Sequence, residues 1–297
     1  MPTSSRRDFL KAASVAAFAG ATADWTSLAQ AAGDKPKQMR YGLVTYMWGA
    51  KWDLSTLISN CEAAEVFGVE LRTTHDHGVE PSLSPAQRKD VKKRFADSRV
   101  VHVGIGSNER FDDPDPAVVR KAIEATKEFI RLSQDTGGSG VKVKPDRFHK
   151  DVPREKTIAQ IGRALNHLGQ YGTDYNQQIR LEVHGQCAEL PTIRKILDVA
   201  DHPNVAICWN SNPQDLQGDG LEKNFELVAD RFGETCHIHA LDTKTYPWEE
   251  FFRLLHAKGY AGWMLLEEGK VPQDPAAELK KQRQLFDELL AATAPKK

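Results

Sequence analysis

The sequence predicts an α/β fold, a single (β/α)8 TIM barrel preceded by a cleavable export leader. Short apolar runs alternate with longer segments of helical periodicity, the order typical of parallel strands joined by crossover helices. Eight such apolar runs occur, and eight strands close a barrel of this kind. Removing a leader of 31 residues from the chain of 297 leaves 266, close to the ~250 residues of a typical (β/α)8 barrel.

The N-terminal segment has the order of a secretory leader. Arg6 and Arg7 form a charged start within SRRDFLK, an Ala-rich stretch follows over residues 12–23, and residues 29–31 read AQA, as at a cleavage site. The apolar part is shorter than the ~20 residues of a spanning helix, so we expect no stable membrane anchor. The arginine pair resembles twin-arginine signals, which implies the twin-arginine export machinery as a partner and a periplasmic or otherwise exported location. An ordinary amphipathic N-terminal helix is the alternative.

We therefore expect a twin-arginine signal peptide over residues 1–31, a polar linker over 32–40 and the barrel over 41–297. The expected strands, in chain order, are Tyr41–Trp48, Gly68–Arg72, Val100–Gly104, Gly140–Lys144, Ile179–His184, Val205–Trp209, Thr235–Ala240 and Gly262–Glu267. Each is a short apolar run that polar or helical segments bound.

The segments between these runs carry helix start signals. Asp53 precedes an apolar stripe, and Ser84-Pro85-Ala86-Gln87 combines an N-cap, a first-turn proline and a capping-box glutamine. A last helix is expected from Asp274 to Leu290. The polar segment Ser211–Gly220 follows the sixth strand, where a loop could cover a pocket.

An open doubly wound sheet is the alternative architecture. It would place a glycine-rich phosphate turn after its first strand. Residues 48–52 read WGAKW, which does not fit GxGxxG, so we prefer the closed barrel.

Composition excludes some functions. Forty Lys and Arg residues balance 41 Asp and Glu residues, so no basic field for nucleic acid is present. The four cysteines form no CxxC pair and lie in or beside apolar runs, which indicates packing residues, although an oxidising compartment leaves a disulfide possible. They are Cys61, Cys187, Cys208 and Cys236.

Polar residues interrupt the later apolar strands at their C-terminal ends, where barrels of this kind hold their functional side chains. The four candidates are Glu182, Asn210, His239 and Glu267. A buried carboxylate such as Glu182 needs a compensating charge, and a cation would supply it. Two carboxylates, an amide oxygen and an imidazole suit Mn²⁺, Mg²⁺, Co²⁺ or Zn²⁺.

The motifs EVHG, HIHALD and LLEEG, in that order after VELR, resemble the xylose-isomerase-like TIM-barrel superfamily of sugar isomerases and epimerases. The resemblance implies that Glu182, Asn210, His239 and Glu267 hold a divalent metal ion. The sequence departs from the family at Asn210, where Asp is usual, and the lost negative charge should weaken or alter the site. Asp215 would be a compensating carboxylate or a solvated loop residue.

The resemblance also implies that Glu182 and Glu267 are catalytic, moving a proton beside a carbonyl as base and acid. Glu268 faces the other way along the strand and is interpreted as structural. The expected substrate-binding residues are Lys144, His184, Arg72 and His102.

The sequence thus predicts an exported, divalent-metal-dependent isomerase or epimerase with a small carbohydrate substrate, either free or as a keto-glycoside. Two alternatives stay open: a lyase that catalyses elimination from keto-glycosides, and a non-catalytic sugar-binding barrel. Asn210 would favour the second alternative. A phosphoesterase like those of the endonuclease branch would need more His and Asp ligands and a basic groove. An oligomer is possible.

Overall fold

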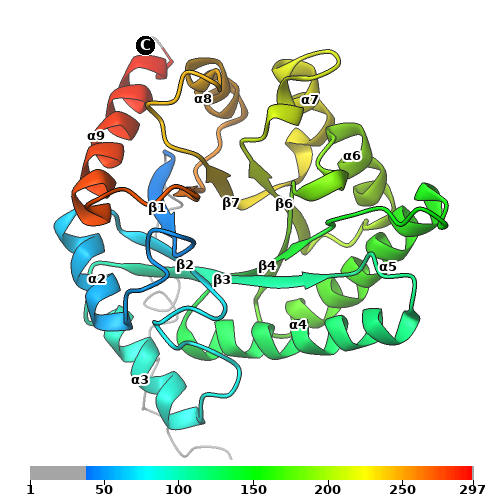
Figure 1. The fold of residues 1–297 in the computed structure, drawn as a ribbon, viewed down its shortest axis with the longest axis horizontal. Coiled ribbons are helices and arrows are strands. Elements are labelled where there is room, and N and C mark those ends of the chain that lie inside the picture. Colours follow the sequence, from blue (N-terminus) through cyan, green and yellow to red (C-terminus); the bar gives the residue numbers. More distant parts are fainter. Residues whose placement is uncertain (1–37, 296–297) are drawn as a thin grey trace, which may run out of the picture. The chain divides into compact units, whose positions relative to one another are not determined.

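The computed structural model describes residues 38–295, so the expected leader lies outside the described residues. Eight parallel strands form one closed barrel in the order β1 to β8 (Figure 1). Their bounds are β1 Arg40–Val44, β2 Gly68–Arg72, β3 Val101–Arg110, β4 Gly140–Lys144, β5 Gln178–Glu182, β6 Val205–Asn210, β7 Phe232–Ile238 and β8 Trp263–Leu266. The predicted barrel is confirmed.

Helices follow the strands and surround the barrel (Figure 1). The α-helices are α2 Leu54–Ala63, α3 Pro85–Ala96, α4 Pro116–Thr136, α5 Arg154–Thr173, α6 Leu190–Val199, α7 Leu221–Val228, α8 Trp248–Lys258 and α9 Pro275–Thr293, and the 3₁₀ turns are η1 Gly185–Cys187, η2 Pro213–Leu216 and η3 Ala229–Arg231. None of the helices within residues 38–295 combines the length and the hydropathy needed to cross a bilayer.

The predicted helix starts are confirmed. The Asp53 carboxylate accepts from the Thr56 amide at the start of α2. At α3 the Ser84 hydroxyl accepts from the Gln87 amide while the Gln87 side chain accepts from the Ser84 amide. These contacts satisfy amides that have no partner within their own helix.

The largest differences from the predicted strand ends are at the carboxyl ends of β1 and β3. β1 stops at Val44, not at Trp48, because the Thr45 hydroxyl accepts from the Arg72 amide and so replaces a backbone ladder contact. β3 continues to Arg110 instead of ending at Gly104. Strand ends are set by such tertiary contacts, which an apolar run alone does not reveal.

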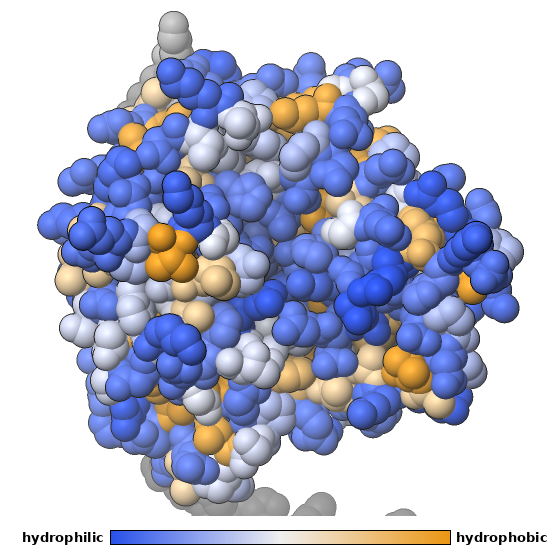
Figure 2. Space-filling view, in the orientation of Figure 1, coloured by the Kyte–Doolittle hydropathy of each residue, from blue (hydrophilic) through white to orange (hydrophobic). Residues whose placement is uncertain are grey.

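The apolar core lies mainly between the strands and the helices. One part is an aromatic cluster in which the Trp209 ring stacks on Phe232 and Phe251, with centroids 5.7 and 5.4 Å away. All four cysteines are free and buried, as expected of packing residues. Hydrophobic residues on the face seen in Figure 2 are scattered among hydrophilic ones.

Candidate active site

Charged side chains occupy the inside of the barrel, where branched apolar residues are usual. Glu70, Lys142, Arg180 and His237 are fully buried. A charge removed from water costs several kcal/mol unless it is paired, so each needs a partner. Arg180 contacts Glu234 at 3.1 Å, near the amino-terminal end of β7, and the other three belong to a separate cluster.

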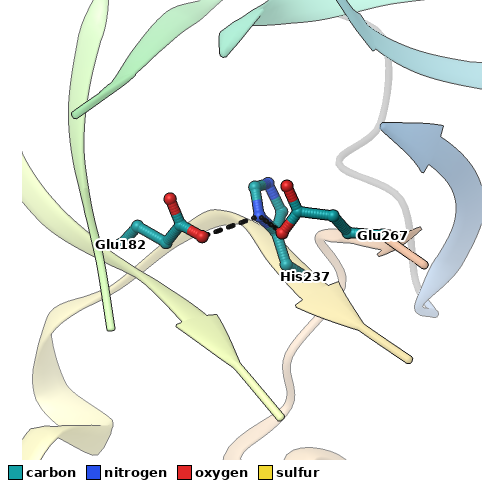
Figure 3. Close-up of side chains that lie close together, drawn as sticks. All are labelled: Glu182, His237 and Glu267. Atoms are coloured by element: carbon teal, nitrogen blue, oxygen red, sulfur yellow. Dashed lines mark hydrogen bonds and ion pairs between the residues drawn. The ribbon is translucent and has the colours of Figure 1, made fainter. Parts of the chain in front are cut away.

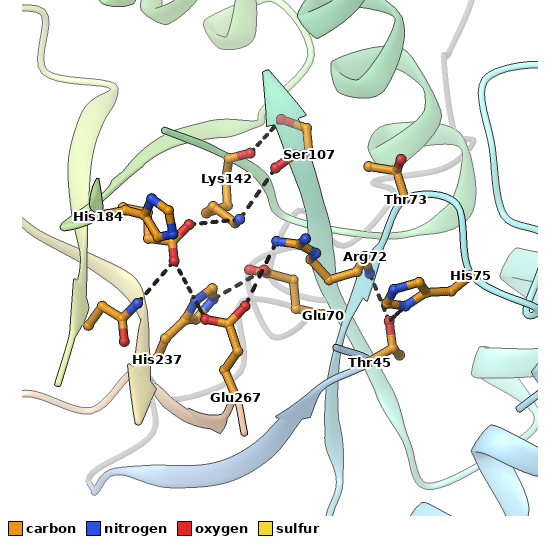
Figure 4. A network of polar contacts seen from close by, with 12 residues as sticks. Thr45, Glu70, Arg72, Thr73, His75, Ser107, Lys142, His184, His237 and Glu267 are labelled. Atoms are coloured by element: carbon orange, nitrogen blue, oxygen red, sulfur yellow. Dashed lines mark hydrogen bonds and ion pairs between the residues drawn. The ribbon is translucent and has the colours of Figure 1, made fainter. Parts of the chain in front are cut away.

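His237, on β7, is the centre of that cluster (Figures 3 and 4). Its Nε2 lies 3.1 Å from Glu70 Oε1, and its Nδ1 lies 3.0 Å from Glu267 Oε2 and 3.6 Å from Glu182 Oε1. Burial alone would lower the pKa of His237, but the neighbouring Cys208, Glu70 and Glu267 raise it well above its usual value. Both ring nitrogens face carboxylates, which favours the protonated imidazole; a metal ion bound at Nδ1 would take the place of the proton on that nitrogen.

Glu70, on β2, reaches His237 through the barrel interior, where β3 leaves room for its side chain. A Cβ atom added at Gly106 would lie 2.7 Å from Glu70 Oε1, closer than real Cβ contacts allow. Glycine at this position therefore makes the Glu70–His237 contact possible.

Glu182 ends β5 and is buried between two donors. The Lys142 ammonium on β4 makes an ion-pair contact with its Oε2 at 2.8 Å, and the Asn210 amide on β6 donates to its Oε1 at 3.0 Å. Burial alone would raise the pKa of Glu182, but Lys142 and His237 hold it well below its usual value. Glu182 is therefore an ionised carboxylate at neutral pH.

Glu267 follows β8 at the solvent side of the cluster, with 8% of the residue exposed. Its Oε2 contacts His237, and its Oε1 lies 3.9 Å from the guanidinium of Arg72, which also lies over the Tyr46 ring. Burial raises the pKa of Glu267, but the charge of His237, its hydrogen bond and the charge of Lys142 together leave this pKa below its usual value. Glu267 thus combines access to solvent with a fixed orientation.

Three of these residues could hold a metal ion, since Glu182, His237 and Glu267 offer ligand atoms that all lie within 4.8 Å of one another. The surroundings fit such a role. Glu70 contacts the other ring nitrogen of His237, as carboxylates do for metal-binding histidines. The buried Oδ1 of Asn210 has no hydrogen-bond partner and would be a further oxygen ligand.

His239 was expected to be the imidazole ligand, and the structure does not bring it into this cluster. β7 ends at Ile238, the His239 side chain is 42% exposed, and its Nδ1 lies 3.0 Å from the Glu267 backbone oxygen. The HIH motif contains two histidines on one strand face. The deeper one, His237, meets the carboxylates.

His102 was expected to bind substrate, and its position excludes this role. The ring stacks on Phe95 of α3 at 5.1 Å, and its nitrogens lie 3.3 Å from the Thr136 oxygen and 3.1 Å from the Gly104 oxygen. His102 therefore faces the helical layer outside the barrel.

The other three expected substrate contacts lie at the carboxyl ends of their strands. Arg72 ends β2 beside Glu267. Lys144 ends β4 on the same strand face as Lys142. His184 follows β5, and its Nδ1 lies 2.9 Å from Asp146 Oδ1.

Asp215 is neither a solvated loop residue nor part of the cluster. It is fully buried in η2, where its Oδ2 accepts from the Tyr246 hydroxyl at 2.8 Å and from the Asn212 amide at 2.9 Å. Burial raises the pKa of Asp215 to about 8. The Asp215–Tyr246 hydrogen bond thus connects the loop after β6 with the loop after β7.

Glu70 and His237 were not expected as members of the site, and Lys142 was not expected to pair with Glu182. One signal was available for Glu70, because VELR places a carboxylate inside an apolar strand as LEV does for Glu182. The pairing of Glu70 with His237 depends on barrel closure and could not be read from local sequence.

The family model described as xylose isomerase-like TIM barrel matches residues 58–289. No curated protein matches the chain. Among solved structures, 3-keto-D-glucoside 4-epimerase from E. coli superposes with a TM-score of 0.71 at 14% identity, over 84% of this chain and 100% of the other. An L-ribulose 3-epimerase gives 0.72 at 18%, over 86% and 96%, and the IolI protein with a bound zinc atom gives 0.71 at 13%, over 87% and 100%.

Proposed function

Since the chain belongs to the xylose isomerase-like TIM barrel family, we propose that it is a carbohydrate isomerase or epimerase that moves a proton beside a carbonyl. The observation that carries this proposal is the convergence of Glu182 and Glu267 on His237 from two strands. Similar folds named as sugar epimerases support it. The substrate would be a small carbohydrate that enters at the carboxyl ends of the strands.

The two glutamates supply the acid and base that this reaction needs. Lys142 keeps Glu182 ionised, so Glu182 takes the proton from the carbon beside the carbonyl, and the C–H electron pair moves to the carbonyl oxygen. For an epimerisation, Glu267 would first take up a proton from solvent and then deliver it to the opposite face of the same carbon. Glu182 would release its proton to solvent before the next turnover. The roles exchange in the reverse reaction.

A divalent metal ion, Mn²⁺, Mg²⁺, Co²⁺ or Zn²⁺, would be held by Glu182, His237 and Glu267, with the Asn210 amide oxygen as a fourth donor. Such an ion supplies positive charge where the oxyanion develops. Both glutamates have a second oxygen engaged elsewhere, by Lys142 and by Arg72. These contacts keep their orientation fixed.

The location rests on the sequence alone. The paired arginines and the AQA site of the leader support export by the twin-arginine pathway to the periplasm or outside the cell. A folded barrel would then acquire its metal before export, and free sugars or keto-glycosides would be the available substrates. A lyase acting on keto-glycosides would share the first proton abstraction.

The test is a product screen with free sugars and 3-keto-glycosides, run with the full chain after its metal content is measured. Glu182→Gln should reduce turnover by at least about a hundredfold, since loss of a general base costs roughly 10²–10⁴. Glu268→Gln is the matched control, because Glu268 is the adjacent carboxylate outside the cluster and should leave turnover within about twofold. Equal activity in both variants, or no turnover of any carbohydrate by the wild type, would contradict the proposal.

A further inference from the structure

Lys144 is a cation at the mouth of the barrel that the proposed proton transfer does not use. It ends β4 and lies two residues beyond Lys142, whose ammonium contacts Glu182 inside the barrel. Because alternate strand residues share a face, Lys144 also points inward, one layer nearer to solvent. Glu182, Glu267 and Arg72 are among the charges that act on it.

The Lys144 ammonium has no carboxylate within 4.0 Å among residues 38–295, whereas the carboxylates around it are paired with other groups. Glu182 contacts Lys142, and Glu267 contacts His237. Asp146, two residues along the chain, contacts Arg110 at 2.8 Å and His184 at 2.9 Å. Glu182 and Glu267 act on Lys144 only from a distance, and no described carboxylate forms an ion pair with it.

This arrangement is unfavourable without a ligand. Lys144 is partly buried, and burial together with the adjacent Lys142 lowers its pKa. A partly desolvated ammonium without a counter-ion costs free energy, and an anionic group entering the mouth would remove that cost. The Lys144 ammonium carries one positive charge. This charge matches the single negative charge of a carboxylate better than the two negative charges of a phosphate monoester.

We propose that the substrate is a sugar acid whose carboxylate is bound by Lys144 above the two glutamates. This inference rests on the proposed function, since it names the substrate class of the same site. Lys144 takes no part in proton transfer. Its ion pair orients the sugar, so that a fixed carbon faces Glu182 and Glu267.

Matched ligand pairs that differ only in the acid group test this inference. D-glucuronate is compared with D-glucose, and 2-keto-D-gluconate with D-fructose, by titration calorimetry and by turnover with the full chain. D-glucose 6-phosphate distinguishes a carboxylate site from a phosphate site. The variants are Lys144→Met, the conservative Lys144→Arg, and Lys195→Met as a control on the exposed face of α6.

The wild type should bind at least one sugar acid about tenfold or more tightly than its neutral partner. Lys144→Met should weaken binding of that acid roughly tenfold to a hundredfold, the range for a hydrogen bond to a charged group, and change the neutral sugar less than about twofold. Lys144→Arg should restore most of the affinity, and Lys195→Met should match the wild type.

Three results would overturn the inference: no preference for either acid, equal losses for acid and neutral sugar in Lys144→Met, or tighter binding of D-glucose 6-phosphate than of the acids. Glu182-dependent turnover of neutral sugars with no preference for acids would leave the proposed function standing while the inference fails. Lys144-dependent binding of an acid without any turnover would support the carboxylate site and count against the proposed reaction.

Discussion

Replacing Lys142 by Met would test how the charged interior of the barrel is stabilised. The Lys142 and Glu182 side chains are 0% and 1% exposed, and the ion-pair atoms lie 2.8 Å apart. Met is similar in length and fits an apolar environment, so the substitution removes the charge with little change in volume. Glu182 would then keep the Asn210 amide and His237 as neighbours but lose its closest cation.

Breaking a buried pair by removing one partner costs about 3–5 kcal/mol. We expect the lower end of that range, about 3 kcal/mol, because Asn210 still donates to Glu182. A loss of that size lowers the Tm of a domain of this size by roughly 6–12 °C. Urea denaturation and thermal melting of the full chain at pH 7 would measure it.

A second substitution separates the charge effect from a packing defect. Glu182→Gln in the Lys142→Met background removes the uncompensated carboxylate and should recover part of the lost stability, since neighbouring changes are not additive. Lys195→Met, on the exposed side of α6, should stay within about 0.5 kcal/mol of the wild type. If Lys142→Met were as stable as Lys195→Met, the reasoning about the buried pair would be wrong.

Three further predictions concern other parts of the chain. Burial raises the pKa of Asp215 from its usual 3.8 to about 8 in the folded state, so the stability that the protonated carboxyl contributes is lost as the pH rises from about 4 to 8. Asp215→Asn should flatten the dependence of the free energy of unfolding on pH, measured by urea denaturation. An unchanged pH dependence would refute the assignment. His237→Asn should reduce bound metal at least about tenfold in elemental analysis, whereas His239→Asn should retain it; the reverse order would restore His239 as the ligand. Ser84→Ala should lower the free energy of unfolding by about 1 kcal/mol through loss of the α3 cap, and no change in urea midpoint would contradict it.

The positions of Glu182, Asn210 and Glu267 could be predicted because each is a polar residue that ends an apolar strand, and parallel strands bring their carboxyl ends together. The choice between His237 and His239 could not be made in this way. His237 lies in β7 and His239 follows directly after the strand ends at Ile238, and the depth of the carboxylates inside the barrel decides which one meets them.

The errors have the same physical origin. His102 was expected to bind substrate, but its ring packs on Phe95 outside the barrel. Asp215 was interpreted as a compensating carboxylate or a solvated loop residue, but it is buried and accepts from the Tyr246 hydroxyl, in the loop after β7. Contacts between segments far apart in the chain determine the positions of both side chains, and a local sequence pattern does not predict such contacts.

In the proposed function, Glu182 and Glu267 transfer a proton at the carbon beside a sugar carbonyl. The most direct test is incorporation of deuterium from ²H₂O at that carbon, followed by NMR, for the wild type, Glu182→Gln, Glu267→Gln and the control Glu268→Gln. We expect exchange in the wild type and in Glu268→Gln, and a loss of at least about a hundredfold in the other two variants. Exchange at the wild-type rate in both Glu182→Gln and Glu267→Gln would contradict it.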